Sequence, residues 1–243
     1  MQRPRLTFIH GFMGHPSDWD AVRSMLPEFE TNALEMPVAA DWQASVNQVV
    51  DGISDSAIVI GYSMGARLAL GVALENPQRC AGLVFVSGNP GLEHVEARER
   101  RWKADQKIAQ ELEQLTQESL QPFLERWYQV DVFATTPQDI RHAEIVRKCE
   151  RFSPEWAKIL RANSVSQQPN YWPRLSELSM PTAVVAGELD EKYREIVVRF
   201  DQEHGSGNVS KTIVSDCGHI VHRQQPETLV QTIRDLVETV AKR

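Results

Sequence analysis

Short runs of apolar residues recur along the chain, and each run ends at residues that favour a turn. Six runs cover residues 6–10, 31–35, 57–60, 81–86, 182–186 and 211–214, and the second and last are the weakest. Near-continuous apolar runs of this length are typical of strands that are buried on both faces of a parallel sheet. The pattern predicts a mostly parallel sheet.

Helical patterns lie between some of these runs. Residues 66–75 are rich in Ala and Leu and stop before Pro77, and residues 227–241 carry apolar side chains at helical spacing just after Pro226. Strands that alternate with helices through short links predict an α/β fold with a doubly wound sheet.

The segment 88–175 breaks this alternation. Residues 93–120 are rich in Glu, Arg, Lys and Gln, a further helix is expected over 122–132, and Pro154 is expected to start a new helix within 143–162. We predict one domain, 1–243, with three or four helices of segment 88–175 inserted as a cap over an active site. A solvated bundle that only shields the core is the alternative.

The strongest chemical signal is Gly61-Tyr62-Ser63-Met64-Gly65, between a predicted strand and a predicted helix. Gly-x-Ser-x-Gly in this setting is typical of the nucleophile elbow of the α/β-hydrolase fold, where a sharp turn lifts the serine above the sheet edge. The helix N-terminus behind Ser63 favours developing negative charge. Ser63 is therefore the predicted reactive residue.

A second turn, His10-Gly11-Phe12-Met13-Gly14, directly follows the first predicted strand. Glycines here allow a backbone N–H to point at a reacting oxygen. We predict an oxyanion hole made by the N–H groups of Phe12 and Met64.

Two further residues complete a Ser, Asp, His order along the chain, which is the order of this fold. His219 follows the last predicted strand and would take the serine proton, and Asp190 would orient the imidazole. Glu188 and Asp216 compete for the acid role, but Asp190 lies past its strand end, in the loop. The third residue after His219 is also a histidine, but no third metal ligand has suitable spacing, so we predict no metal and no cofactor.

Arginines indicate the kind of substrate. Arg67 is expected in the first turn of the helix behind Ser63, and the predicted cap carries four more: Arg98, Arg100, Arg101 and Arg147. Because arginine binds carboxylates in a bidentate manner, the set indicates a substrate with carboxylates, although most arginines on a charged helix only face water.

Composition narrows the setting. The net charge of −7 disfavours a nucleic-acid partner, and three widely spaced cysteines in 243 residues form no disulfide framework. No signal peptide or membrane-length apolar run is apparent. We expect a cytoplasmic protein, a monomer or weak homo-oligomer, that acts on a small anionic molecule.

Over nearly its full length the chain resembles the MenH family, the 2-succinyl-6-hydroxy-2,4-cyclohexadiene-1-carboxylate (SHCHC) synthases of menaquinone biosynthesis. The specific matches are 61–67, 89–92, 127–128, 132–134, 187–190 and 218–223. The resemblance implies a lyase that eliminates pyruvate from 2-succinyl-5-enolpyruvyl-6-hydroxy-3-cyclohexene-1-carboxylate, with Ser63, His219 and Asp190 removing a ring proton.

The resemblance also implies which residues bind this substrate. The arginines that hold carboxylates match Arg67, Arg101 and Arg147, and the aromatic pocket residues match Tyr62 and Trp127. The loop 34–40 departs from the pattern, since it lacks the Gly-His-Gly often present in this fold.

Two other functions compete with the lyase. A carboxylester or thioester hydrolase could use the same three residues, although cations beside Ser63 suit an anionic substrate better than a neutral ester. A non-catalytic binding protein predicts a broken triad, which the sequence does not have.

Overall fold

A single parallel sheet forms the centre of the molecule. The computed structural model describes residues 5–205 and 207–243, and its six strands are ordered β2-β1-β3-β4-β5-β6. They are β1 (Leu6–Ile9), β2 (Thr31–Leu34), β3 (Ala57–Tyr62), β4 (Cys80–Val86), β5 (Thr182–Gly187) and β6 (Val209–Val214). The predicted sheet is confirmed. The two weak candidates, β2 and β6, are the edge strands, and their partial exposure explains their weak apolar signal.

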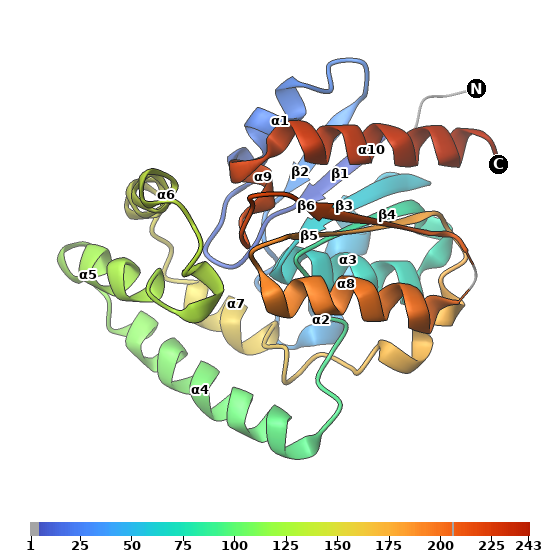
Figure 1. The fold of residues 1–243 in the computed structure, drawn as a ribbon. Coiled ribbons are helices and arrows are strands. Elements are labelled where there is room, and N and C mark those ends of the chain that lie inside the picture. Colours follow the sequence, from blue (N-terminus) through green and yellow to red (C-terminus); the bar gives the residue numbers. More distant parts are fainter. Residues whose placement is uncertain (1–4, 206) are drawn as a thin grey trace.

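Helices cover both faces of this sheet (Figure 1). One face is covered by α1 (Asp20–Ser24) and α10 (Pro226–Ala241), and the other by α2 (Trp42–Gly52), α3 (Met64–Glu75) and α8 (Glu191–His204). The short helix α9 (Val221–Gln224) leads into α10. Neither α2 nor α8 is predicted from the sequence, because their polar outer faces dilute their apolar pattern. Within the described residues no helix is both long and apolar enough to cross a membrane.

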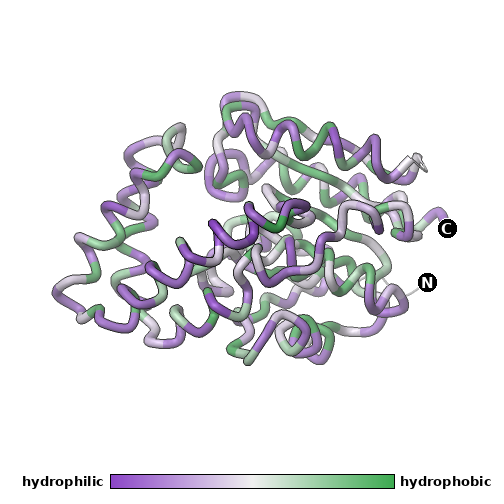
Figure 2. The backbone as a smooth tube through the Cα atoms, turned by 90° about the horizontal axis from the view of Figure 1, so that it is seen from below, coloured by the Kyte–Doolittle hydropathy of each residue, from purple (hydrophilic) through white to green (hydrophobic). Residues whose placement is uncertain are grey.

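Between β4 and β5 the chain leaves the sheet and forms four α-helices. These are α4 (Val95–Glu113), α5 (Gln117–Trp127), α6 (Gln138–Glu150) and α7 (Trp156–Ala162). They extend to one side of the sheet, away from both chain ends (Figure 1). Figure 2 shows mainly hydrophilic positions along this part and more hydrophobic ones in the rest of the molecule. We call residues 88–175 the cap segment.

One predicted helix start in the cap segment is wrong. We expected a helix to begin at Pro122, but α5 begins at Gln117 and Pro122 lies inside it. The reason is a capping box: the Thr116 side chain accepts from the Ser119 N–H, and the Ser119 hydroxyl accepts from the Thr116 N–H. These bonds give partners to backbone N–H groups in the first turn of α5. Pro122 lies in the second turn, where it removes only one helical hydrogen bond.

The turn between β3 and α3 is packed against β1. A Cβ on Gly61 would collide with the backbone of Gly65, and one on Gly65 would collide with the carbonyl oxygens of Ile9 and His10. Between these glycines Ser63 has φ 53° and ψ −109°, a conformation that non-glycine residues rarely adopt. Strain of this kind is retained where the surrounding structure enforces it, which is common at active sites.

This packing predicts that Gly65→Ala is severely destabilising. The new methyl group would meet rigid backbone, so we expect the free energy of unfolding, measured by urea denaturation, to fall by about 3 kcal/mol. Gly52→Ala is the matched control, because a Cβ there meets only the flexible Leu34 side chain. Equal losses in the two variants would contradict the close approach at Gly65.

Candidate active site

Three side chains meet where β3, β5 and β6 end. His219 Nδ1 lies 2.6 Å from Asp190 Oδ2, and His219 Nε2 lies 3.4 Å from Ser63 Oγ. The side chains of His219 and Asp190 are 3% and 5% exposed, so water competes little for their hydrogen bond. In this arrangement Asp190 orients the imidazole, and the imidazole can accept a proton from Ser63.

The two acids that competed with Asp190 lie elsewhere. Glu188 and Asp216 are both exposed, and the Glu188 carboxylate accepts a hydrogen bond from the Asp216 N–H at 3.2 Å. Only Asp190 among the three contacts His219. The backbone brings Asp190 and His219 together, because Gly187 passes so close to the carbonyls of Cys217 and Gly218 that no side chain would fit there.

The turn after β1 lies beside Ser63. Gly14 N–H donates to Gly11 O at 3.1 Å, and the third residue of this turn, Met13, has φ 55°. A positive φ at this position defines a type II turn, where glycine is preferred and another residue adds strain of about 1 kcal/mol. Phe12, the second residue, lines the cavity at Ser63 together with Met64. Met64 begins α3, so its N–H has no acceptor within the helix.

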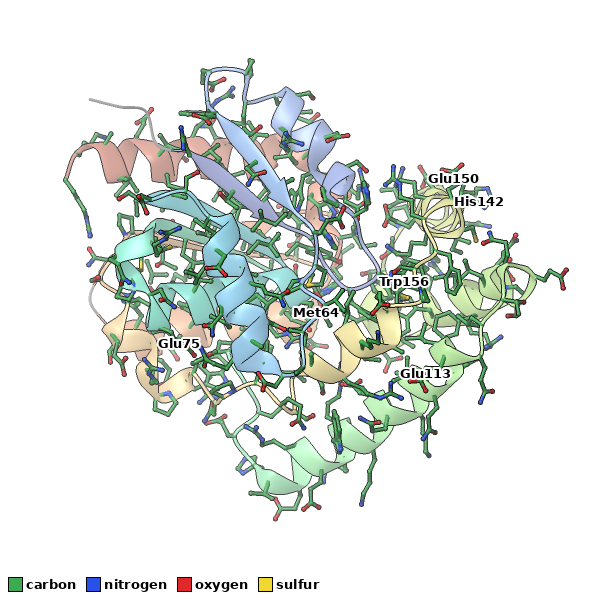
Figure 3. The ribbon with its side chains drawn as sticks, turned by 180° about the vertical axis from the view of Figure 1, so that it is seen from behind. Met64, Glu75, Glu113, His142, Glu150 and Trp156 are labelled. Atoms are coloured by element: carbon green, nitrogen blue, oxygen red, sulfur yellow. The ribbon has the colours of Figure 1, made fainter. Side chains whose placement is uncertain are left out.

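A cavity of about 800 Å³ opens at Ser63, large enough for a substrate of drug-like size. Its walls come from the turn after β1, the elbow, the start of α8 and the cap segment. Figure 3 shows Met64 on the side of the core that faces the cap segment, whereas Glu113, His142 and Glu150 lie far out on it. The predicted site residues that line the cavity are Ser63, Asp190, His219, Phe12, Met64, Arg67, Arg101 and Trp127.

Arg67 is the most unusual residue of this cavity. It is 7% exposed, and it donates to Gln168 Oε1 at 3.1 Å and to Asn163 O at 2.7 Å. In the described chain no carboxylate lies within ion-pair distance of it. Burial, and then the nearby Arg101, lower the pKa of Arg67 to about 10. A buried cation without a counter-charge is costly, and an anionic ligand would supply that charge.

Arg101, on α4, faces the same cavity. Its Nε contacts both oxygens of the buried Asp105 carboxylate at 2.9 Å. Within the described residues its two terminal nitrogens have no hydrogen-bond partner, so they are available to an incoming carboxylate.

Tyr62 does not reach the large cavity. It lines a smaller cavity of about 60 Å³ that also touches Ser63, Phe12 and Trp127. Its ring packs between His219 and His222, with centroid distances of 5.4 and 4.5 Å. Tyr62 therefore packs against His219 from outside the large cavity, while Trp127 lines both cavities.

The structure does not bring Arg147 to the site, contrary to the prediction. Arg147 points along α6 to Glu144, with NH2 2.6 Å from Oε1, and lines a separate surface groove. A helix turns by about 100° per residue, so the next residue faces another way. That residue, Lys148, is buried and lines the small cavity beside Ser63.

Sequence reasoning also missed two residues at the start of α8. Lys192 and Tyr193 line the large cavity, and the Tyr193 ring centroid lies 4.6 Å from that of His219. Partial desolvation by the surrounding protein, and then the nearby Arg101, lower the pKa of Lys192, although the residue is still exposed to solvent. One signal was available: a lysine two residues after Asp190 lies in the first turn of a helix, where the helix dipole disfavours a cation.

His222, the histidine three residues after His219, lies on α9 and is 3% exposed. Burial, and then Arg223, lower its pKa to about 3, so it is neutral at pH 7. Among residues 5–205 and 207–243, no three His, Cys, Asp or Glu side chains form a cluster that could hold a metal ion.

A strained serine in an elbow, a histidine bonded to an acid and a glycine-rich turn beside them are the arrangement typical of the α/β-hydrolase fold. A sequence profile described as "Alpha/beta hydrolase family" matches residues 8–232. The chain therefore belongs to the alpha/beta hydrolase family.

Relatives and solved structures agree with this family. Proteins named 2-succinyl-6-hydroxy-2,4-cyclohexadiene-1-carboxylate synthase from Serratia proteamaculans and Enterobacter sp. (strain 638) are 29% and 27% identical, covering 97% and 96% of this chain and 93% and 92% of their own. The structure of MenH from S. aureus has a TM-score of 0.89 at 23% identity, covering 99% and 96% of the two chains. A thermophilic esterase from Thermogutta terrifontis has a TM-score of 0.75 at 20% identity, covering 98% and 90%.

The charges around Glu144 predict a pH-dependent stability. Although burial raises its pKa, Lys148 and Arg223 outweigh this and lower it to about 2. A lowered carboxyl pKa stabilises the fold above the ordinary value of 4.5, and this contribution is lost as the pH falls from 4.5 towards 2. We expect Glu144→Gln to lower the free energy of unfolding by about 3 kcal/mol at neutral pH and by much less near the folded-state pKa.

Urea denaturation of both proteins across this pH range measures the difference. Glu155→Gln is the control, since Glu155 forms only a surface ion pair with Lys158. A gap between wild type and Glu144→Gln that stays constant with pH would rule out the ionised Glu144 as its source.

Proposed function

We propose that the protein is an SHCHC synthase, a carbon–oxygen lyase of menaquinone biosynthesis. The observation that carries the proposal is Arg67, a buried guanidinium without a counter-ion that lines the same cavity as Ser63. A neutral ester would leave this charge unpaired, whereas a carboxylate would pair with it. The names of the relatives from Serratia and Enterobacter support the same activity.

The proposed substrate is 2-succinyl-5-enolpyruvyl-6-hydroxy-3-cyclohexene-1-carboxylate, which carries three carboxylates. Arg67 and Arg101 would each hold one of them, and Lys192 is the third cation that lines the large cavity. Trp127 offers an apolar wall for the ring. Because Arg147 lies outside this cavity, it has no place in the proposed binding mode.

The reaction is a proton abstraction followed by loss of a leaving group. Ser63, with its own proton directed to His219, removes a proton from the ring carbon, and Asp190 stabilises the imidazolium that results. The electron pair left on the succinyl-bearing ring carbon forms a double bond to the next ring carbon, and the existing ring double bond shifts by one position. The bond from the ring to the enolpyruvyl oxygen then breaks towards oxygen, which gives the 2,4-diene. Pyruvate leaves as its enolate and is then protonated. No water is consumed and no acyl-enzyme forms.

The N–H groups of Phe12 and Met64 would stabilise the negative charge that develops as the proton leaves. Such donors are fixed in place before the reaction begins, and removing one of them slows the reaction by about 10²–10³-fold. The start of α3 adds the positive end of its helix dipole at the same point.

Pyruvate release from the enolpyruvyl substrate tests the activity. We expect release by the wild type and a loss of about 10³-fold or more in Ser63→Ala, because the base is removed while the oxyanion turn remains. A coupled lactate dehydrogenase assay follows the reaction. Absence of release by the wild type, or full activity in Ser63→Ala, would refute the proposal.

The competing activity is carboxylester or thioester hydrolysis by the same three residues. Turnover of p-nitrophenyl acetate distinguishes the two, because a hydrolase would form an acyl-enzyme on Ser63 that mass spectrometry detects. We expect slow turnover and no accumulated adduct.

Arg67→Met tests the carboxylate contact. Loss of a buried charge pair with substrate is expected to lower kcat/KM for pyruvate release by about 10²–10³-fold. Arg100→Met is the matched control, since Arg100 is exposed on α4 and does not line the cavity. Similar kcat/KM values for the two variants would show that Arg67 does not bind the substrate.

We also propose that the enzyme works in the cytoplasm. Its three cysteines, Cys80, Cys149 and Cys217, are free thiols, which suits a reducing compartment. A monomer or weak homo-oligomer remains our prediction for its assembly.

A further inference from the structure

The cap segment contacts the oxyanion turn directly. Lys148, on α6, donates from Nζ to the Met13 carbonyl oxygen at 3.1 Å. Both side chains are buried, at 7% and 4% exposure. The two residues are 135 positions apart in the chain, so this bond exists only when α6 lies against the core.

The Met13 carbonyl is a sensitive point for such a contact. Met13 holds the positive φ of the type II turn from Gly11 to Gly14, a conformation that favours glycine. With a non-glycine residue at its third position, a type II turn is less favoured relative to other turn types. A buried donor on the carbonyl of that residue holds the Met13–Gly14 peptide in place, and with it the loop that carries the Phe12 N–H.

A second connection holds the far end of the same loop. Arg223, four residues after His219, donates from Nε to Glu144 of α6 at 3.0 Å and from NH2 to Asp18 at 2.9 Å. Asp18 in turn accepts a hydrogen bond from the His15 N–H at 2.9 Å. The contacts of α6 therefore reach both the oxyanion loop and the helix that follows the catalytic histidine.

Lys148 is already engaged on both sides. Besides Met13 O, its ammonium lies 3.4 Å from the Glu144 carboxylate, and the cavity it lines holds only about 60 Å³. An ammonium with these two acceptors, beside so small a space, is suited to fix protein groups rather than to bind a large substrate. In this it differs from Arg67, which lines the large cavity without a counter-ion.

We propose that Lys148 is a positioning residue, which couples the docking of α6 to the shape of the oxyanion turn. When α6 is docked, Lys148 fixes the Met13 carbonyl and the Phe12 N–H points at the reacting oxygen. When α6 moves away, the turn is released and the oxyanion hole loses one donor. The site is thus complete only with the cap segment in place.

Lys148→Met tests this coupling, because methionine keeps the apolar stem and removes the donor. Glu144 keeps Arg147 and Arg223 as partners in this variant. Loss of a positioned oxyanion donor acts on the transition state, so we expect kcat for pyruvate release to fall about 10–100-fold, with KM changed less than about threefold. Lys148→Arg, which keeps a cationic donor, is expected to recover most of kcat.

The control is Lys158→Met on α7, which removes a lysine that is 64% exposed and paired only at the surface. It is expected to match the wild type. A kcat within about twofold of wild type in Lys148→Met would overturn the proposal, and so would a higher KM at unchanged kcat, which would make Lys148 a substrate ligand.

Hydrogen–deuterium exchange provides a readout that needs no substrate. We expect faster exchange of the peptide covering residues 10–18 in Lys148→Met and wild-type exchange in Lys158→Met; unchanged exchange in Lys148→Met would overturn the proposal. The kinetic arm rests on the proposed lyase activity, but this arm does not, so the two proposals can fail separately. Should Lys148→Met not fold, Lys148→Gln, whose polar group is too short to reach Met13, replaces it in both measurements.

Discussion

The close approach of the elbow to β1 is the constraint on which the site depends. Gly65 lies directly against the carbonyls of Ile9 and His10, and Gly61 lies against Gly65. This contact fixes the start of α3 beside the turn that follows β1. Ser63, Met64 and Phe12 thereby line one cavity, although they come from two segments about fifty residues apart. No side chain larger than hydrogen would allow this arrangement.

Charge divides the surroundings of Ser63 into two parts with different roles. Around the large cavity, Arg67 has no counter-ion and Arg101 uses only its Nε, so positive charge remains available to a ligand. Around α6, by contrast, Glu144 and Asp18 are bonded to Lys148 and Arg223, and these charges hold the protein to itself. The first set leaves positive charge for the anionic substrate that we propose, whereas the second joins the cap segment to the core.

The sequence predicted the parts of the site that depend on local patterns. The elbow at Ser63, the glycine turn at Phe12 and the strand ends carrying Asp190 and His219 all follow from short motifs beside apolar runs. The structure differs from the prediction where a side chain's position depends on which face of a helix points at the site. Arg147 and Lys148 are neighbours in sequence, and only the angle at which α6 docks turns Lys148 inward and Arg147 outward. Lys192 was missed because its role depends on a cavity formed by distant segments.

The central claim is that Ser63 serves an elimination and not a hydrolysis. Mass spectrometry of the ring product formed from the enolpyruvyl substrate, compared with an enzyme-free sample, tests it most directly. Elimination predicts a cyclohexadiene product formed without the addition of water, together with pyruvate and an unmodified Ser63. A ring product that has gained the elements of water, or an acyl group on Ser63, would contradict the account.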